Sequence, residues 1–315
     1  MKFRTLSFVA LSALVLFSGY SCRKKEEKPA PSIGKLSVVA TLFPNYDFAK
    51  NIGGDRAEVT LLLPPGVEPH AFEPKPEDII RIQKADILIY TGKFMEPWVE
   101  DLLKGIDSRK LIVVDASKGI ALLEEKEEEP AHGHGHDEDM DPHIWLDLER
   151  AQSMAGNILE GFIRADSAGK ELYTKNAEQY RIRLSELDKK FKEGLAGCKT
   201  RVFIHGGHFA FGYLAKRYDL KYLSAYEGFS PDAEPSPRKL TDLVKKLRQH
   251  GLRHVFYEEL VSPKTAQTIA KEAGATLLQL HASHNLTKDE WDKGATFIGL
   301  MEGNLNNLRT GIQCR

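Results

Sequence analysis

Histidine is the residue type in this sequence with the clearest capacity for chemistry, and 11 are present. Four of them stand next to short apolar runs: His70, His143, His208 and His281. Imidazole nitrogen suits Zn²⁺, which favours four nitrogen, sulfur or oxygen ligands in a tetrahedral arrangement. A single histidine is more often a hydrogen-bonded core or surface residue than a ligand, and no short chelating motif such as H-E-x-x-H occurs. A shared ion therefore requires the fold to bring distant residues together.

Two of these histidines lie on segments with a constrained backbone or next to a helix start. His70 ends the segment PPGVEPH, whose prolines restrict the chain. His143 lies in DPHIWLDLE, just before Asp147, which we expect to cap the N-terminus of a helix. The stiffness of the His70 segment suits it to placing a side chain reproducibly.

The other two histidines follow expected strands. His208 comes after residues 201–204 across a Gly-Gly pair and is expected to open a helix, while His281 ends the strand expected over 276–280. Ligand sites in open α/β sheets gather at the carboxyl ends of strands. Since two of the four histidines come from each half of the chain, one metal bound by all of them would lie between the halves.

Short β-branched runs alternate with amphipathic segments through both halves. Strands are expected at 36–41, 58–63, 86–90 and 111–114, and again at 201–204, 220–223, 254–257 and 276–280. Helices are expected near 45–52, 76–84 and 97–103, and after Ser236-Pro237 and Ser262-Pro263. The alternation predicts an α/β fold with parallel sheets covered on both faces.

The middle of the chain has a different pattern. No strand signal occurs over 148–196, and 170–194 reads as one long, charged helix. We therefore expect an N-terminal α/β lobe over 35–150, a helical linker with a long rigid connecting helix over 151–197, and a C-terminal α/β lobe over 198–315. A rigid helix would limit hinge opening between the lobes.

The N-terminus has the pattern of an export signal. A basic start and an apolar run over 6–17 indicate a signal peptide over 1–21, and the run is too short to span a bilayer. Cys22 follows directly and resembles a lipidated cysteine, with simple cleavage and a free protein as the alternative. The charged, proline-containing stretch over 22–34 is expected to be a tether. Either outcome places the mature protein outside the cytoplasm.

Composition excludes several classes of protein. The chain has 315 residues, 42% apolar and 28% charged, with a net charge of −1, which is typical of a globular protein and argues against a general nucleic-acid binder. Neither a P-loop nor G-x-G-x-x-G occurs, so nucleotide binding is not supported. Cys198 and Cys314 could pair in an oxidising compartment or remain separate thiols, and the sequence leaves both possibilities open.

An acidic, histidine-containing insertion occupies residues 124–141. His132, His134 and His136 alternate with glycine among carboxylates, a composition that cannot form a core. One interpretation is a solvated loop without a particular role. The other is a low-affinity collector that raises the metal concentration near the main site.

Several long segments identify a family. The sequence resembles the zinc/manganese solute-binding proteins of bacterial ABC importers in VVATLFPNYDFAKNIGGDRAEVTLLLPPGVEPHAFEPKPEDI, DPHIWLDL, HFAFGYLAKRYDL and EGFSPDAEPSPRKLTDLVKKL. The resemblance implies two (β/α)₄ lobes joined by a single long helix, with the metal site in the interlobe cleft. It also implies delivery of the metal to a membrane permease, from the periplasm or the outer face of the cytoplasmic membrane.

The same resemblance suggests the ligands. His70, His143 and His208 match the family's first three ligand positions, and histidine at the third position accompanies zinc rather than manganese. The fourth family ligand is an Asp after the last strand, where this chain has Leu280-His281-Ala282-Ser283, so we expect His281 to be the fourth ligand. The alternatives are a water, one of three carboxylates, or a shifted register, with the residues Glu68, Glu227, Glu258 and His284 as candidates.

The sequence therefore predicts a monomeric, non-enzymatic protein that captures Zn²⁺ and passes it to a cognate ABC permease. A site made of four neutral imidazoles would disfavour hard, oxygen-preferring Mn²⁺. A manganese or iron carrier of the same importer class is the alternative. A secreted zinc hydrolase is a remote one, since it would need an open water position on the metal.

Overall fold

Two parallel sheets with the same strand order organise the computed structural model, which describes residues 34–124, 140–226, 228–229 and 235–315. The first sheet has the order β2-β1-β3-β4, and its strands are β1 (Leu36–Ala40), β2 (Ala57–Leu61), β3 (Ile87–Tyr90) and β4 (Ile112–Asp115). The second has the order β8-β7-β9-β10, with β7 (Val202–His205), β8 (Lys221–Ser224), β9 (His254–Tyr257) and β10 (Thr276–Gln279). We call residues 35–165 the N-terminal lobe and 198–315 the C-terminal lobe. The expected α/β fold with two parallel sheets is confirmed.

The eight strands of the two parallel sheets form where the sequence predicted them, with shifts of up to two residues at their ends. β3 is the run ILIY, and each of its residues is buried. Such continuous burial is typical of a strand in a parallel sheet with helices on both faces. In the C-terminal lobe, β7 is likewise buried along its length. The carboxyl ends of β7 and β10 lead into the loops that carry His208 and His281.

Among the described residues, the α-helices of the N-terminal lobe are α1 (Phe43–Gly53), α2 (Pro76–Lys84), α3 (Trp98–Gly105) and α4 (Leu148–Ala165). The side chain of Asp147 accepts a hydrogen bond from the Glu149 amide at 2.9 Å and so caps α4, as expected. α4 packs against β3 and β4. Residues 148–165 thus cover the first sheet, and the connecting element is α5 (Lys170–Ala196) alone.

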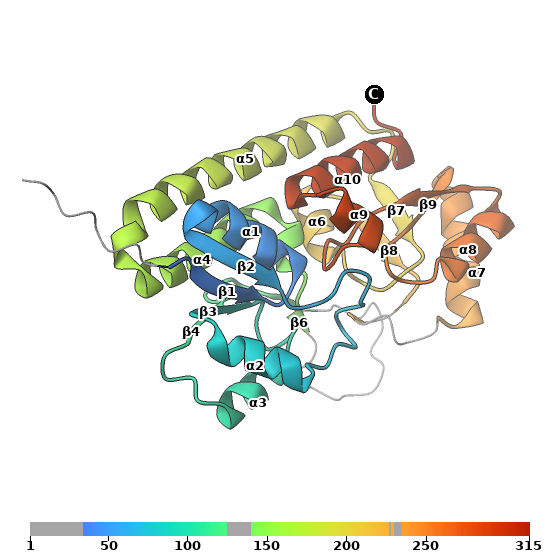
Figure 1. The fold of residues 1–315 in the computed structure, drawn as a ribbon. Helices are drawn as coiled ribbons and strands as arrows, with labels where there is room; N and C mark the ends of the chain where they lie inside the picture. The colour runs from blue at the N-terminus through green and yellow to red at the C-terminus, as the bar shows by residue number, and fades with distance from the viewer. Residues whose placement is uncertain (1–33, 125–139, 227, 230–234) are drawn as a thin grey trace, which may run out of the picture. The chain divides into compact units, whose positions relative to one another are not determined.

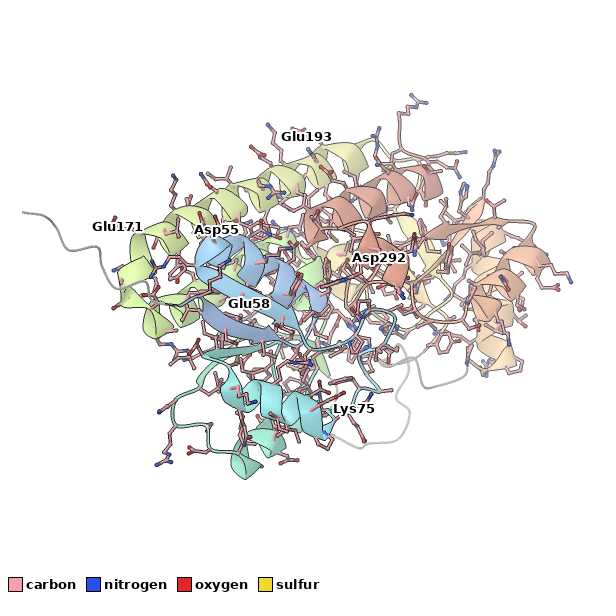
Figure 2. All side chains as sticks on the ribbon, viewed as in Figure 1. Asp55, Glu58, Lys75, Glu171, Glu193 and Asp292 are labelled. Atoms are coloured by element: carbon pink, nitrogen blue, oxygen red, sulfur yellow. A yellow bond between two sulfur atoms is a disulfide. The ribbon has the colours of Figure 1, made fainter. Side chains whose placement is uncertain are left out.

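α5 runs past both lobes (Figure 1). It packs against α1 and α4 of the N-terminal lobe and against α10 (Phe297–Gly311) of the C-terminal lobe. Its buried face includes Tyr180, Leu184 and Phe191, whereas charged side chains such as Glu171 and Glu193 project away from the protein (Figure 2). One apolar core continues from β1 through α4 and α5 to α10. The two lobes are therefore joined by packing as well as by chain connection.

The C-terminal lobe is completed by α6 (Gly212–Arg217), α7 (Pro237–Gln249), α8 (Lys264–Ala273) and α9 (Lys288–Asp292). Ser236 caps α7 by accepting from the Lys239 amide, and Pro237 is the first helical residue, as expected. Cys198, just after α5, and Cys314, just after α10, form a disulfide. The pairing that the sequence left open is thus made, and it ties the two ends of this lobe together.

Some predictions fall outside the described residues. They concern the signal peptide over 1–21, most of the tether with Cys22, and His132, His134, His136 and Glu227. The short antiparallel strands β5 (Leu123–Glu124) and β6 (Met140–Asp141) flank the acidic insertion. Within the part of the chain that the structure describes, no helix has the combined length and apolar character needed to cross a membrane.

Candidate metal site

Four histidines from four loops converge between the lobes. One ring nitrogen from each of His70, His143, His208 and His284 lies within 4.8 Å of the other three. Nε2 of His143 and Nε2 of His208 are 3.3 Å apart. In a tetrahedral zinc site with Zn–N bonds of about 2.0–2.1 Å, neighbouring ligand nitrogens are about 3.3–3.4 Å apart. The arrangement is therefore close to the geometry that one Zn²⁺ requires.

The state of the ring nitrogens agrees with a cation site. Nε2 of His70 and Nε2 of His284 are buried and make no hydrogen bond. Leaving such nitrogens buried and unpaired is unfavourable, and a bound cation would satisfy both. His143, His208 and His284 are buried, whereas His70 is partly exposed. His70 is thus the member of the cluster with some contact with solvent, although its Nε2 is buried.

His70 and His143 are positioned by the N-terminal lobe. His70 lies in the loop between β2 and α2, where the side chain of Glu68 accepts a hydrogen bond from the Ala71 amide at 3.1 Å. His143 follows β6, and Oδ1 of Asp141 contacts both its backbone amide at 2.9 Å and its Nδ1 at 2.8 Å. The Asp141 carboxylate therefore directs Nε2 of His143 toward the cluster.

His208 lies in the loop after β7 and not in a helix. The expectation that it opens a helix is wrong, because α6 begins at Gly212. The hydroxyl of Tyr222 donates to the His208 carbonyl at 2.8 Å, and Oε1 of Glu258 accepts from the His208 amide at 3.1 Å. These bonds hold the residue in the loop between β7 and α6. A Cβ at Gly207 would collide with the Glu258 carboxylate, so the Gly-Gly pair permits this approach.

The fourth histidine of the cluster is His284, and His281, the predicted fourth ligand, lies outside the cluster. Nδ1 of His281 lies 3.1 Å from Oε1 of Glu259, and its Nε2 lies 3.4 Å from Glu290, so both ring nitrogens already face carboxylates. Ser283 has a left-handed backbone conformation, with φ of 61°. This turn reverses the chain after β10 and points His284 into the cluster. The shifted register, one of the alternatives, is the one that the structure supports.

Carboxylates stand behind three of the four imidazoles. Asp141 contacts Nδ1 of His143, Oε2 of Glu258 lies 2.7 Å from Nδ1 of His208, and Oε1 of Glu259 lies 3.8 Å from Nδ1 of His284. A carboxylate on the distal nitrogen fixes the ring orientation and makes the other nitrogen a stronger donor. These three negative charges also offset the charge of a divalent cation held by neutral ligands. Our sequence reasoning missed Asp141 and Glu259, and it considered Glu258 only as a direct ligand.

Burial keeps most of the cluster uncharged. It lowers the pKa of His70 to about 3 and the pKa of His284 to about 3, and it holds the pKa of His143 well below its usual range. For His208 burial acts in the same direction, but the Glu258 carboxylate outweighs it and raises the pKa above its usual value. Three of the four imidazoles are therefore neutral and ready to bind a metal, and within the cluster His208 is the one that keeps its proton to a higher pH than an ordinary histidine.

This difference predicts an unusual pH dependence of metal binding. Below the raised pKa of His208 the metal must displace one proton, so affinity should fall by about tenfold per pH unit. Four ordinary histidines would together approach a fourth-power dependence. The measurement is a Zn²⁺ competition titration between pH 5 and pH 8. In Glu258→Gln the pKa of His208 should drop, so the decline should begin at a lower pH. A slope near four in the wild-type protein would contradict the assignment.

Comparison with known proteins agrees with this geometry. The family model described as "Zinc-uptake complex component A periplasmic" matches residues 38–311. The chain is 41% identical to the high-affinity zinc uptake system protein ZnuA of Bacillus subtilis (strain 168), over 88% of each chain. It is 36% identical to the zinc-binding lipoprotein AdcA of Streptococcus pneumoniae, over 98% of this chain and 61% of AdcA, so it spans well under the full length of that relative.

Solved structures show the same similarity. The metal-dependent lipoprotein YcdH of Bacillus subtilis has a TM-score of 0.76 at 38% identity, covering 88% of this chain and 99% of that one. The Zn(II)-bound ZnuA-like domain of Streptococcus pneumoniae AdcA has a TM-score of 0.75 at 35% identity, covering 89% of this chain and 99% of that domain. The two-lobed fold is thus shared with proteins of known structure.

Proposed function

The chain belongs to the zinc-uptake complex component A family, and from this premise we propose that it captures Zn²⁺ outside the cytoplasm and delivers it to a membrane ABC permease. The family consists of solute-binding proteins rather than enzymes. Zinc is the cargo: the protein coordinates the ion reversibly and transforms no substrate. Release to the permease requires that the ligands separate, and ligands drawn from both lobes allow this.

The observation that carries the proposal is the convergence of His70, His143, His208 and His284 on one point. All four donors in this cluster are imidazole nitrogens, which suit Zn²⁺. Mn²⁺ prefers oxygen donors, and in the described part of the chain the carboxylates nearest the rings lie behind them. The donor set therefore favours zinc over manganese or iron. A hydrolase is disfavoured because four protein ligands would leave no position on the metal for a reactive water.

A competition titration of metal-free protein with Zn²⁺ and Mn²⁺ tests this proposal. We expect Zn²⁺ to bind more tightly than Mn²⁺ by at least about a thousandfold, following the order of divalent affinities at nitrogen sites. Elemental analysis of natively loaded protein should find zinc at one ion per chain. A preference for Mn²⁺, or a natively bound metal other than zinc, would contradict the proposal.

The location and partners of the protein are part of the same proposal. We infer export, lipid anchoring through Cys22 and a monomeric state, and the relative AdcA is named a lipoprotein. We also infer that His132, His134 and His136 collect metal near the entrance, since the strands that flank the insertion are near the site: Asp141 of β6 contacts His143. The disulfide is consistent with an oxidising compartment.

A further inference from the structure

The segment that carries His284 is hydrogen-bonded to both lobes, and the lobe that supplies most of these bonds changes at Ser283. The segment comprises residues 281–287, between β10 and α9. Ser283 is fully buried and adopts the left-handed conformation. Because non-glycine residues adopt this conformation at a cost, the surrounding contacts must hold it in place. Most hydrogen bonds to the segment before Ser283 come from the C-terminal lobe, although Nε1 of Trp145 donates to the Ala282 carbonyl at 2.8 Å, whereas the backbone after Ser283 is bonded by the N-terminal lobe.

Before Ser283 the segment is bound mainly to the C-terminal lobe. The His281 amide donates to Oδ1 of Asn304 at 2.7 Å, and Nδ2 of Asn304 donates back to the His281 carbonyl at 2.8 Å. The amides of Ala282 and Ser283 donate to the Glu259 carboxylate at 2.8 and 3.0 Å. Asn304 lies on α10 and Glu259 follows β9, so this part of the segment follows the C-terminal lobe.

From His284 onward the segment is bound to the N-terminal lobe. The Phe43 amide, at the start of α1, donates to the His284 carbonyl at 2.9 Å. The Gly66 amide donates to the Leu286 carbonyl at 2.7 Å. Gly66 belongs to the proline-rich loop that ends at His70. The backbone of the fourth histidine is thus fixed to the same lobe that carries the first.

Asn285 supplies the side-chain part of this attachment. It is fully buried, and its Nδ2 donates to the carbonyls of Pro64 at 2.8 Å and Val67 at 2.9 Å. Its Oδ1 accepts from the Leu286 amide at 2.8 Å. The Pro64 carbonyl also accepts from the Val67 amide at 3.1 Å, so the Asn285 side chain adds a second bond to that carbonyl and bonds the Val67 carbonyl as well. Asn285 therefore joins the His284 segment directly to the His70 loop.

We propose that Asn285 is a positioning residue that fixes His284 against His70 and thereby sets how long the site retains a bound divalent cation. The inference rests on the proposed function and deepens it. His284 is donated by the C-terminal part of the sequence, yet it is held with His70 and His143 in the N-terminal lobe. His208 is then the ligand that would leave when the lobes separate. Removing the side-chain amide of Asn285 would let His284 move away from His70 and His143 before the lobes separate.

The test compares Asn285→Asp with a matched control. Asp keeps the Oδ1 acceptor but loses both N–H donors and places a charge beside two carbonyls. In the control, Asn157→Asp, the lost Nδ2 also bridges two carbonyls, those of Ala116 and Lys118, at 2.9 Å each, within the N-terminal lobe. Asn285→Ala is the second variant and removes the donors without adding charge. Zinc release is measured by mixing the loaded protein with excess chelator.

We expect both Asn285 variants to release zinc about 10–100-fold faster than wild type, in the range for loss of a group that orients a metal ligand. The control should lose comparable thermal stability in its metal-free form but release zinc within about twofold of wild type. The Co²⁺-loaded Asn285 variants should also show an altered visible absorption spectrum, because the geometry at the metal changes. Unchanged release rates in both Asn285 variants, or an equal acceleration in the control, would overturn the proposal.

Hydrogen exchange in the metal-free protein separates this inference from the proposed function. The Gly66 amide should exchange faster in Asn285→Asp than in wild type, because its acceptor, the Leu286 carbonyl, would no longer be held. If wild-type protein fails to bind zinc tightly, the proposed function fails while this measurement still decides whether Asn285 ties the segment to the loop. If the Gly66 amide exchanges at an unchanged rate, the inference that Asn285 holds the His284 segment to the His70 loop is wrong, whatever the metal affinity.

Discussion

Replacing His284 by alanine should weaken Zn²⁺ binding by more than about a hundredfold, whereas His281→Ala should change it by less than about tenfold. The loss of a group that only orients a ligand costs about 10–100-fold, and a lost ligand should cost more. His281 is engaged with Glu259 and Glu290 outside the cluster, so its removal acts on zinc only through its neighbours. The measurement is a competition titration against a zinc chelator of known affinity.

The pair of variants is a sharp test because the two residues are only three positions apart. Both substitutions remove one buried imidazole from the same segment, so differences in general stability largely cancel. His143→Ala serves as the positive control for loss of a ligand. If His281→Ala abolishes tight binding while His284→Ala does not, the position of the segment after β10 is wrong. Equal, small losses would instead indicate that neither residue is a ligand.

Removing the disulfide should cost about 2–5 kcal/mol of unfolding free energy. Cys198 and Cys314 are 116 residues apart, so the bond closes almost the whole C-terminal lobe into one loop. In the chain-entropy description, a cross-link that closes a loop of that size stabilises the folded protein by up to about 5 kcal/mol, because it restricts the unfolded chain. That is a large share of the roughly 5–15 kcal/mol typical of folded domains.

Equilibrium denaturation of Cys198→Ser/Cys314→Ser, compared with wild type in oxidising buffer, measures this effect. Zinc affinity at a temperature where both proteins are folded should change by less than about threefold, because neither cysteine belongs to the four-histidine cluster. The amides of Lys199 and Thr200 still bond the carbonyls of Gln313 and Ile312, so the local geometry has support without the bond. An unchanged denaturation midpoint would contradict the prediction.

Much of the fold could be predicted from local pattern because each element has its own signal. The apolar run ILIY predicts a buried strand, and Ser236-Pro237 predicts a helix start, without knowledge of any distant residue. The long helix over 170–194 was predicted from its charged, strand-free composition. At the start of this helix Leu172 is 38% exposed, whereas Tyr173 is buried. Consecutive residues of a helix point about 100° apart, so the two side chains face different surroundings.

The errors at the site have a different cause. His208 was expected to open a helix, since an aromatic, helix-compatible stretch follows it. The structure keeps it in a loop because Tyr222 and Glu258 bind its carbonyl and amide. Glu258 is 50 residues away in sequence, so no local window contains the competing partner. Tertiary hydrogen bonds overrode the local preference for a helix.

By itself, the sequence determined the residue types that can bind a cation, the alternation of strands and helices, and the candidate ligands His70, His143 and His208. Only the tertiary structure decided that His284, and not His281, faces the other three. The backbone turn at Ser283 is held by Glu259 on one side and by Phe43 on the other, and these residues are 24 and 240 or more positions away. Periodicity records which face a residue occupies within its own element. It carries no information on a loop whose direction is set by bonds from both lobes.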